Sequence, residues 1–236
     1  MPEVLILTST INEYDGVAEA VSLLSFRNFT PRLFMTGPGK INAAISLTRL
    51  LSAPNEFSFL LAAGTSGSLD KDLKAGDVVA SAEALIGDWR HEECGETTVG
   101  VYGIFEYGPP TPERVAQMVL KSPPDTAQKL LAKLDPMYFY QGRTFSSDTF
   151  VAGQSLKLSI GKTYGCRICE MESGAVSFTA GLLNPRLPWL HLRVVADTLE
   201  DTLSDYFDLE KDMTKILGQR AGEALSALDL NWDLIF

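Results

Sequence analysis

The sequence predicts an α/β fold: a three-layer αβα sandwich around a mixed, mostly parallel central sheet. Short apolar runs typical of strands alternate with segments that have the spacing of amphipathic helices. The run at residues 57–63 is almost entirely apolar, as is typical of a central strand covered on both faces. With 45% hydrophobic and 21% charged residues, a chain of 236 residues can bury a full core. We expect residues 1–236 to form a single domain.

The first part of the chain shows the strand-then-helix pattern twice. A buried-strand run comes first each time, and a segment of helical spacing follows it. The turn at residues 37–40 (Gly-Pro-Gly-Lys) separates the second strand from its helix, and the turn at residues 75–76 (Ala-Gly) introduces a later strand. The expected elements are strand 4–7, helix 13–24, strand 32–36, helix 41–51, strand 57–63 and strand 77–85.

The second part of the chain begins with a stretch of weak periodicity. Glycine and proline interrupt residues 86–112, which we expect to be irregular, and residues 121–125 (Lys-Ser-Pro-Pro-Asp) are expected to form a loop. Regular patterns then return, and the last of them has the spacing of a long amphipathic helix. The remaining expected elements are strands 137–145 and 167–170, helix 173–183, strand 188–195 and helix 205–228.

Charge and cysteine content narrow the class of protein. The formal net charge is −10, without a cluster of basic residues, so we expect no nucleic-acid partner. Three cysteines do not make a disulfide framework, and Cys166 and Cys169 lack the second pair that a zinc site needs. No run approaches the ~18 apolar residues of a membrane span, and residues 4–7 are too short for a signal peptide. We expect a cytoplasmic protein with no membrane partner, no cofactor and no metal.

Three acidic residues follow apolar strands of the expected sheet: Glu13, Glu172 and Asp197. In sheets of this kind ligands bind beyond the carboxyl ends of the strands, where these side chains would lie. Any one of them could be a helix cap or part of a solvated turn. Three together favour a functional site, because a half-buried carboxylate is costly unless it is hydrogen-bonded or functional.

Six short segments resemble the nucleoside phosphorylase and nucleosidase superfamily, and especially the bacterial methylthioadenosine/S-adenosylhomocysteine nucleosidases. They occur in the order of that family, and the resemblance runs from about residue 4 to residue 230. It implies a nucleoside phosphorylase-like sandwich, a homodimer, and cleavage of the N-glycosidic bond of a purine nucleoside. The segments are residues 36–44, 63–69, 73–79, 147–150, 170–175 and 192–197.

The resemblance implies a role for each acid in the chemistry. Asp197 resembles the general acid at purine N7, and Glu13 resembles the base that activates water, with Thr65 and Arg193 helping to hold that water. Bond cleavage leaves negative charge on the base and oxocarbenium character on the sugar, so one protonated carboxyl and one carboxylate serve both needs. Arg193 could equally be a buried arginine that orients a carboxylate.

The same resemblance implies the substrate contacts. Glu172 resembles the acid that binds the ribose 2′ and 3′ hydroxyls, which suits a carboxylate with two acceptor oxygens. Met171 would lie against the sugar, Phe150 would stack on the purine, and the backbone of Val151 would read the base edge. Three further aromatic residues resemble those that cover a 5′ alkylthio tail, namely Phe105, Tyr107 and Phe207.

Water, and not phosphate, is the expected nucleophile. The phosphorylases that resemble this chain carry a phosphate-binding arginine three residues before the threonine, where this chain has Ala62. Lys40 is the residue type that the nucleosidases show in the Gly-Pro-Gly-Lys turn. We therefore expect hydrolysis of 5′-methylthioadenosine or S-adenosylhomocysteine, with release of adenine.

Departures from the family pattern leave alternatives open. Ala196 stands where a serine is usual before the acid, the usual Ser-His pair is absent from residues 199–203, and the segment between Glu13 and Gly37 is short enough to have lost a hairpin. A futalosine hydrolase of menaquinone biosynthesis is one alternative, and a purine nucleoside phosphorylase is another. A nucleoside-binding protein without activity would have lost Glu13 or Asp197, and both are present.

Overall fold

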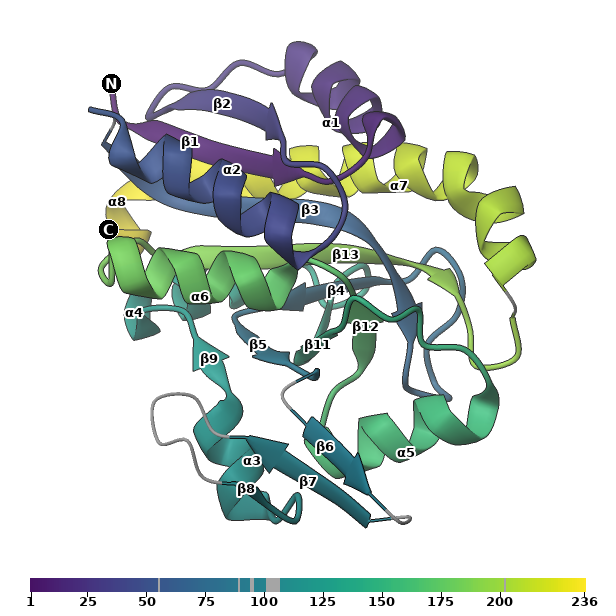
Figure 1. The fold of residues 1–236 in the computed structure, drawn as a ribbon. Helices are drawn as coiled ribbons and strands as arrows, with labels where there is room; N and C mark the ends of the chain where they lie inside the picture. The colour runs from purple at the N-terminus through teal and green to yellow at the C-terminus, as the bar shows by residue number, and fades with distance from the viewer. Residues whose placement is uncertain (55, 89, 94–95, 101–106, 202) are drawn as a thin grey trace.

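A computed structural model of the chain describes residues 1–54, 56–88, 90–93, 96–100, 107–201 and 203–236. For residues 90–93, 96, 107, 124 and 203–211 it describes the backbone only. Figure 1 shows a central sheet covered by helices on both faces, as the sequence predicts. No helix within the described ranges is both long enough and apolar enough to cross a membrane.

Two long strands, β3 (Phe57–Ser68) and β13 (Trp189–Asp197), lie side by side in parallel at the centre of a ten-stranded sheet. The first half of β3 also pairs in parallel with β1 (Glu3–Thr8), which pairs in parallel with β2 (Thr30–Met35). The shorter strands extend the sheet in the order β12, β11, β5 and β9 beyond β3, and β4 and β10 beyond β13. Their bounds are Ile168–Glu170, Thr144–Ser146, Glu83–Ile86, Leu120–Lys121, Val78–Ser81 and Tyr140–Gln141.

The sheet is mixed and mostly parallel. Among the described strands of this ten-stranded sheet, the antiparallel pairings are β12 with β3, β13 with β4, and β5 with β9. The parallel pairings bring the carboxyl ends of β1, β3 and β13 to the same edge of the sheet, and β13 ends at Asp197 beside Gly67 of β3. This edge is where the site residues of the sequence analysis were expected.

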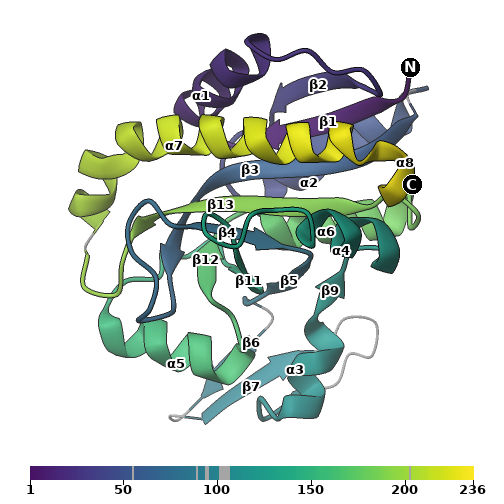
Figure 2. The ribbon, with the colours of Figure 1, turned by 180° about the vertical axis from the view of Figure 1, so that it is seen from behind.

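Helices cover the two faces of the sheet. On one face lie α1 (Ile11–Ser22) and α7 (Leu203–Leu230), with α4 (Pro124–Leu131) and α8 (Trp232–Ile235) at the end of α7 (Figure 2). On the other face lie α2 (Lys40–Ser52) and α6 (Ser173–Leu183). Strand β1 shows why both faces are filled: Val4 and Ile6 join the first core, and Leu5 and Leu7 the second, because side chains alternate along a strand.

Several expected elements differ from the structure in their extent. The single strand expected at 77–85 is two strands, β4 and β5, which are separated at Ala82. Strand β4 pairs with β13, whereas β5 pairs with β11. The strand expected at 137–145 is likewise divided into β10 and β11, on either side of Gly142. In both cases two short strands pair with different partner strands. The residue pattern of one continuous run does not indicate such a change of partner.

Three regions hold elements that the sequence analysis did not predict. The stretch expected to be irregular contains a small antiparallel sheet of β6 (Arg90–Glu93), β7 (Glu96–Gly100) and β8 (Tyr107–Gly108), followed by α3 (Pro112–Met118). The loop expected at 121–125 is shorter: Lys121 ends β9, residues 122–123 are irregular, and α4 begins at Pro124, where a proline at the first helical position is favourable. Helix α5 (Gln154–Tyr164) lies between two glycines with positive φ, Gly153 and Gly165.

Candidate active site

A cavity of about 420 Å³ opens beyond the carboxyl ends of the central strands. Its walls come from β3, from β13, from the turn after β1 and from the loops after β11 and β12. Seven of the residues predicted from the sequence line it together: Glu13, Thr65, Phe150, Val151, Met171, Glu172 and Asp197.

Glu13 is held in this wall by the start of α1. Thr10 is the N-cap of the helix, and its side chain and that of Glu13 form a reciprocal capping box. The Glu13 carboxylate also reaches β3, where Oε1 accepts from the backbone N of Thr65 at 2.8 Å and from its Oγ1 at 3.0 Å. Oε2 accepts from Ser9 N at 2.9 Å, Ser9 Oγ at 2.7 Å and Thr10 N at 3.0 Å. The residue is therefore a helix cap and a cavity-lining acid at once.

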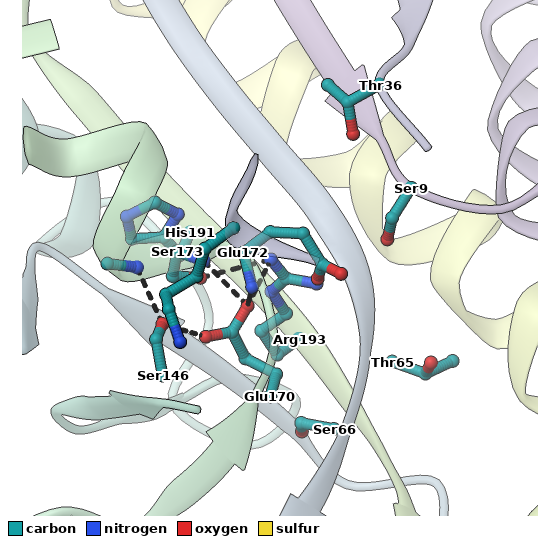
Figure 3. A network of polar contacts seen from close by, with 12 residues as sticks. Ser9, Thr36, Thr65, Ser66, Ser146, Glu170, Glu172, Ser173, His191 and Arg193 are labelled. Carbon is teal, nitrogen blue, oxygen red and sulfur yellow. Dashed lines mark hydrogen bonds and ion pairs between the residues drawn. The ribbon is translucent and has the colours of Figure 1, made fainter. Parts of the chain in front are cut away.

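Arg193 lies behind the cavity and pairs with two glutamates (Figure 3). Its Nη2 is 2.7 Å from Oε2 of Glu170 and 3.0 Å from Oγ of Ser173, and its Nη1 is 3.5 Å from Oε2 of Glu172. Glu170 in turn accepts from the hydroxyl of Ser146 and from the backbone N of Ser173 at 2.7 Å. The structure thus shows the guanidinium orienting carboxylates.

Glu172 follows β12 and precedes α6. Its Oε1 accepts from the backbone N of Gly39 at 2.8 Å, so the Gly-Pro-Gly-Lys turn closes over this carboxyl. Burial raises the pKa of Glu172 to about 7; Arg193 opposes that rise, and Glu170 and Glu13 add to it. Near neutral pH the carboxyl therefore exists in both protonation states.

Asp197 ends β13 and is almost fully buried, with its carboxyl oxygens packed over Gly67. Its Oδ2 is 2.5 Å from Nζ of Lys157, a fully buried lysine of α5. Burial raises the pKa of Asp197, and the Lys157 ammonium opposes that rise. A carboxyl with a raised pKa is suited to donate a proton into the cavity.

One wall of the cavity is apolar and is formed by Phe150, Val151 and Met171. A flat purine and a sugar match such a wall better than an ion does. Phe105, predicted to cover a 5′ substituent, lies outside the described residues. The side chains of Tyr107 and Phe207, given the same role, are also outside the description.

The residues that bear on the nucleophile lie around the same turn. Lys40 pairs with the carboxylates of Asp88 and of Asp148, at 3.1 Å for the latter, so its charge is already balanced. Ala62 is buried beside Arg193 and Thr8 around a separate small cavity of about 10 Å³. A space of that size holds about one water molecule.

Sequence reasoning gave no role to Glu170, Ser146 or Lys157. Glu170 lies in the segment at residues 170–175 that resembles the family, but its pairing with Arg193 depends on how β12 and β13 lie across the sheet. Lys157 carried no signal, because its helix was not predicted and a lysine is seldom fully buried. Among the described residues no three His, Cys, Asp or Glu side chains are grouped so that they could hold a metal ion.

The arrangement can act on a glycosidic bond. Around one cavity with apolar lining it offers the buried carboxyl of Asp197, whose pKa is raised, and the hydrogen-bonded carboxyl of Glu13. A leaving base needs the first as a proton donor, and an electron-poor sugar carbon needs the second.

Comparison with known proteins gives consistent relationships. Residues 22–228 match the sequence model of the phosphorylase superfamily. A 5′-methylthioadenosine/S-adenosylhomocysteine nucleosidase of Staphylococcus aureus is 28% identical over 201 residues, which are 80% of this chain and 78% of the relative.

Solved structures share the fold over nearly the whole chain. The Helicobacter pylori 5′-methylthioadenosine/S-adenosylhomocysteine nucleosidase superposes with a TM-score of 0.77 at 15% identity, covering 95% of this chain and 98% of that one. A futalosine hydrolase of Helicobacter pylori superposes with a TM-score of 0.75 at 16% identity, covering 96% and 97%. The Neisseria meningitidis nucleosidase in complex with methylthio-immucillin-A gives 0.74 at 20% identity, covering 97% and 100%.

Proposed function

This chain belongs to the phosphorylase superfamily, and on that premise we propose that it hydrolyses the N-glycosidic bond of a purine nucleoside. The substrate we propose is 5′-methylthioadenosine or S-adenosylhomocysteine, and the base released is adenine. The observation that carries the proposal is the meeting of three buried carboxyls, Glu13, Glu172 and Asp197, on one cavity with an apolar slot. The curated relative from Staphylococcus aureus is a nucleosidase of this kind.

In this proposal each carboxyl has a separate task. Asp197 gives its proton to N7 as the electron pair of the C1′–N9 bond passes to the purine. Glu13 takes a proton from the water that attacks C1′, and Thr65 helps to hold that water, while Arg193 orients the carboxylates of Glu170 and Glu172. Glu172 accepts hydrogen bonds from the ribose hydroxyls. Phe150 stacks on the base, Val151 reads its edge through the backbone, and Met171 lies against the sugar.

Two observations support water as the nucleophile. Ala62 offers no cation, and the small cavity beside it has room for about one water molecule and not for a phosphate ion. Lys40, the nearest candidate cation in the turn over Glu172, is paired with Asp88 and Asp148 and therefore has no charge to spare for an anion.

Futalosine hydrolysis is the second candidate. The TM-score to a futalosine hydrolase, 0.75, lies between those to the Helicobacter pylori and Neisseria meningitidis nucleosidases, 0.77 and 0.74. Ala196 provides no side-chain donor beside Asp197, so the acid side of the cavity differs from the family pattern. The 5′ substituent would be decided by Phe105, Tyr107 and Phe207.

A panel assay tests the proposal. Methylthioadenosine, S-adenosylhomocysteine, futalosine, adenosine and inosine are incubated separately with the protein, with and without phosphate and with a chelator, and products are separated by chromatography. We expect adenine and a free reducing sugar, fastest from methylthioadenosine and without need of phosphate or metal. Faster turnover of futalosine favours the second candidate, and ribose 1-phosphate as the product refutes hydrolysis. Binding without turnover of any compound refutes an enzyme.

We also propose that the protein acts as a cytoplasmic homodimer. Four apolar side chains near the carboxyl edge of the sheet are strongly exposed: Ile41 and Ile45 lie one turn apart on α2, Met35 ends β2, and Ile11 starts α1. A second copy of this chain seated on them would cover an apolar surface that lies next to the elements of the cavity.

A further inference from the structure

Lys157 is fully buried, which is rare for a lysine unless it is paired. Its Nζ lies 2.5 Å from Oδ2 of Asp197 and also donates to the backbone carbonyl of Thr198. One ammonium therefore holds both the carboxyl at the end of β13 and the peptide that follows it. Ala196, on the other side of Asp197, has no side-chain donor.

Stability alone is a weak reason for such a pair. Taking two charges out of water costs several kcal/mol, and a well-packed apolar pair in the same place is often no less stable. Here one member of the pair lines the cavity, and the other stands behind it in the helix that follows Phe150 and Val151. The positions of Asp197 and Lys157 are both explained if the Lys157 ammonium acts on the Asp197 carboxyl.

We infer that Lys157 is a positioning residue that orients Asp197 and sets its strength as an acid. The inference rests on the proposed function, in which Asp197 protonates the leaving purine. When the proton passes to N7, Asp197 is left as a carboxylate in a buried place. The Lys157 ammonium beside Oδ2 stabilises that carboxylate, so the proton is given up more readily.

Other charged or titratable groups around Asp197 act less directly. Asp201, four residues along the chain, raises the pKa of Asp197 through its negative charge. Cys169 of β12 lies near by, but burial raises the pKa of this thiol to about 12, so it stays neutral at physiological pH. Lys157 is the cation of this set, and its removal would leave burial and Asp201 to raise the pKa of Asp197 without opposition.

The test compares the pH dependence of kcat in wild type, Lys157→Gln and Lys157→Met. Turnover requires protonated Asp197, so it declines as pH rises through the pKa of that carboxyl. Without the ammonium we expect this decline to move up by about one to two pH units. The maximal kcat should fall about 10- to 100-fold, because the acid is weaker and less well placed. Lys162→Met, an exposed position of the same helix, should keep the wild-type profile.

A double-mutant cycle separates an effect through Asp197 from a general structural one. In an Asp197→Asn background, Lys157→Met should cost no further activity, whereas an independent role would reduce activity again. This background also removes the unpaired carboxylate, so folding does not obscure the result if Lys157→Met alone is unstable.

A measurement without substrate keeps this inference separate from the proposed function. The Asp197 carboxyl is titrated by ¹³C NMR in wild type and in Lys157→Gln. A pKa that rises by a unit or more in the variant supports the inference even if no nucleoside is turned over. An unchanged carboxyl titration, or a wild-type pH profile in the Lys157→Gln variant, overturns it.

Discussion

The two ends of the candidate site carry acids of different character, although both are buried. Glu172 is surrounded by a guanidinium, a backbone N–H and two other carboxylates, and its pKa is raised to about 7. Asp197 faces one ammonium, and its pKa is raised as well. In the proposed function Glu172 accepts hydrogen bonds and Asp197 donates a proton, so the two titrations would affect activity in opposite directions.

The pKa of Glu172 leads to a prediction for binding. Only its ionised form accepts bonds from both ribose hydroxyls, so affinity for a non-hydrolysable nucleoside analogue should rise by about tenfold from pH 6 to pH 8. Because the pKa of Asp197 is raised as well, its own titration could also change binding, so the clean measurement is calorimetry in an Asp197→Asn background. There, Glu172→Gln should bind weakly with no pH dependence. If Glu172→Gln binds the analogue as tightly as its parent protein does, Glu172 does not bind the ribose.

Glu13 has a structural task at the start of α1 and, in the proposed function, a chemical task as the base, and a glutamine would impair both. Its two oxygens accept from Ser9, Thr10 and Thr65, whereas an amide nitrogen in one of these places would face donors. We expect Glu13→Gln to lose turnover and also about 1–3 kcal/mol of the free energy of unfolding. Glu19→Gln, exposed on the same helix, should change neither. Near-normal turnover in Glu13→Gln would mean that the residue is only a helix cap.

At the scale of the element, β3 determines how closely the site residues approach one another. A Cβ atom built on Gly67 would lie 2.7 Å from Oδ2 of Asp197, and one on Gly64 would lie 2.2 Å from Nη1 of Arg193. Both side chains therefore rest on bare backbone. Because β3 is packed between β13 and its other neighbouring strands, its backbone cannot shift away to make room for an added Cβ atom.

This packing predicts different outcomes for two glycine-to-alanine changes. Gly67→Ala should displace Asp197 and lower kcat by about 10²-fold. Gly181→Ala is the matched control, since Gly181 lies in α6 with nothing within 4 Å of the added Cβ. It should keep full activity and gain about 0.5–1 kcal/mol, because alanine favours the helix. Thermal unfolding and steady-state kinetics of both variants test these predictions. A fully active Gly67→Ala would contradict the close approach of the Asp197 carboxyl to the backbone of Gly67.

At the scale of the whole molecule, the exposed face of α2 predicts assembly. We expect the protein to sediment as a dimer at micromolar concentration and Ile45→Glu to sediment as a monomer, because a charge in an apolar interface is costly. Leu230→Glu, at the end of α7 on the other face of the sheet, should remain dimeric. A wild-type protein that is monomeric and fully active would refute the assembly.

The sequence by itself determined the layers of this protein and the acids of its site. Residues 173–183 became the helix that was expected, and because this helix is apolar on most sides it is buried nearly all round. Glu13, Glu172 and Asp197 could be picked out because each follows an apolar strand, and parallel strands end at one edge.

The tertiary structure alone decided which strands are divided and what stands behind each acid. The run at residues 77–85 has the pattern of one strand, yet it breaks at Ala82 because its two halves pair with different strands, β4 with β13 and β5 with β11. Lys157 lies buried against Asp197, in a helix that the sequence analysis did not predict. Such contacts join residues far apart in sequence, and local periodicity carries no information about them, because they depend on how the strands and helices pack together.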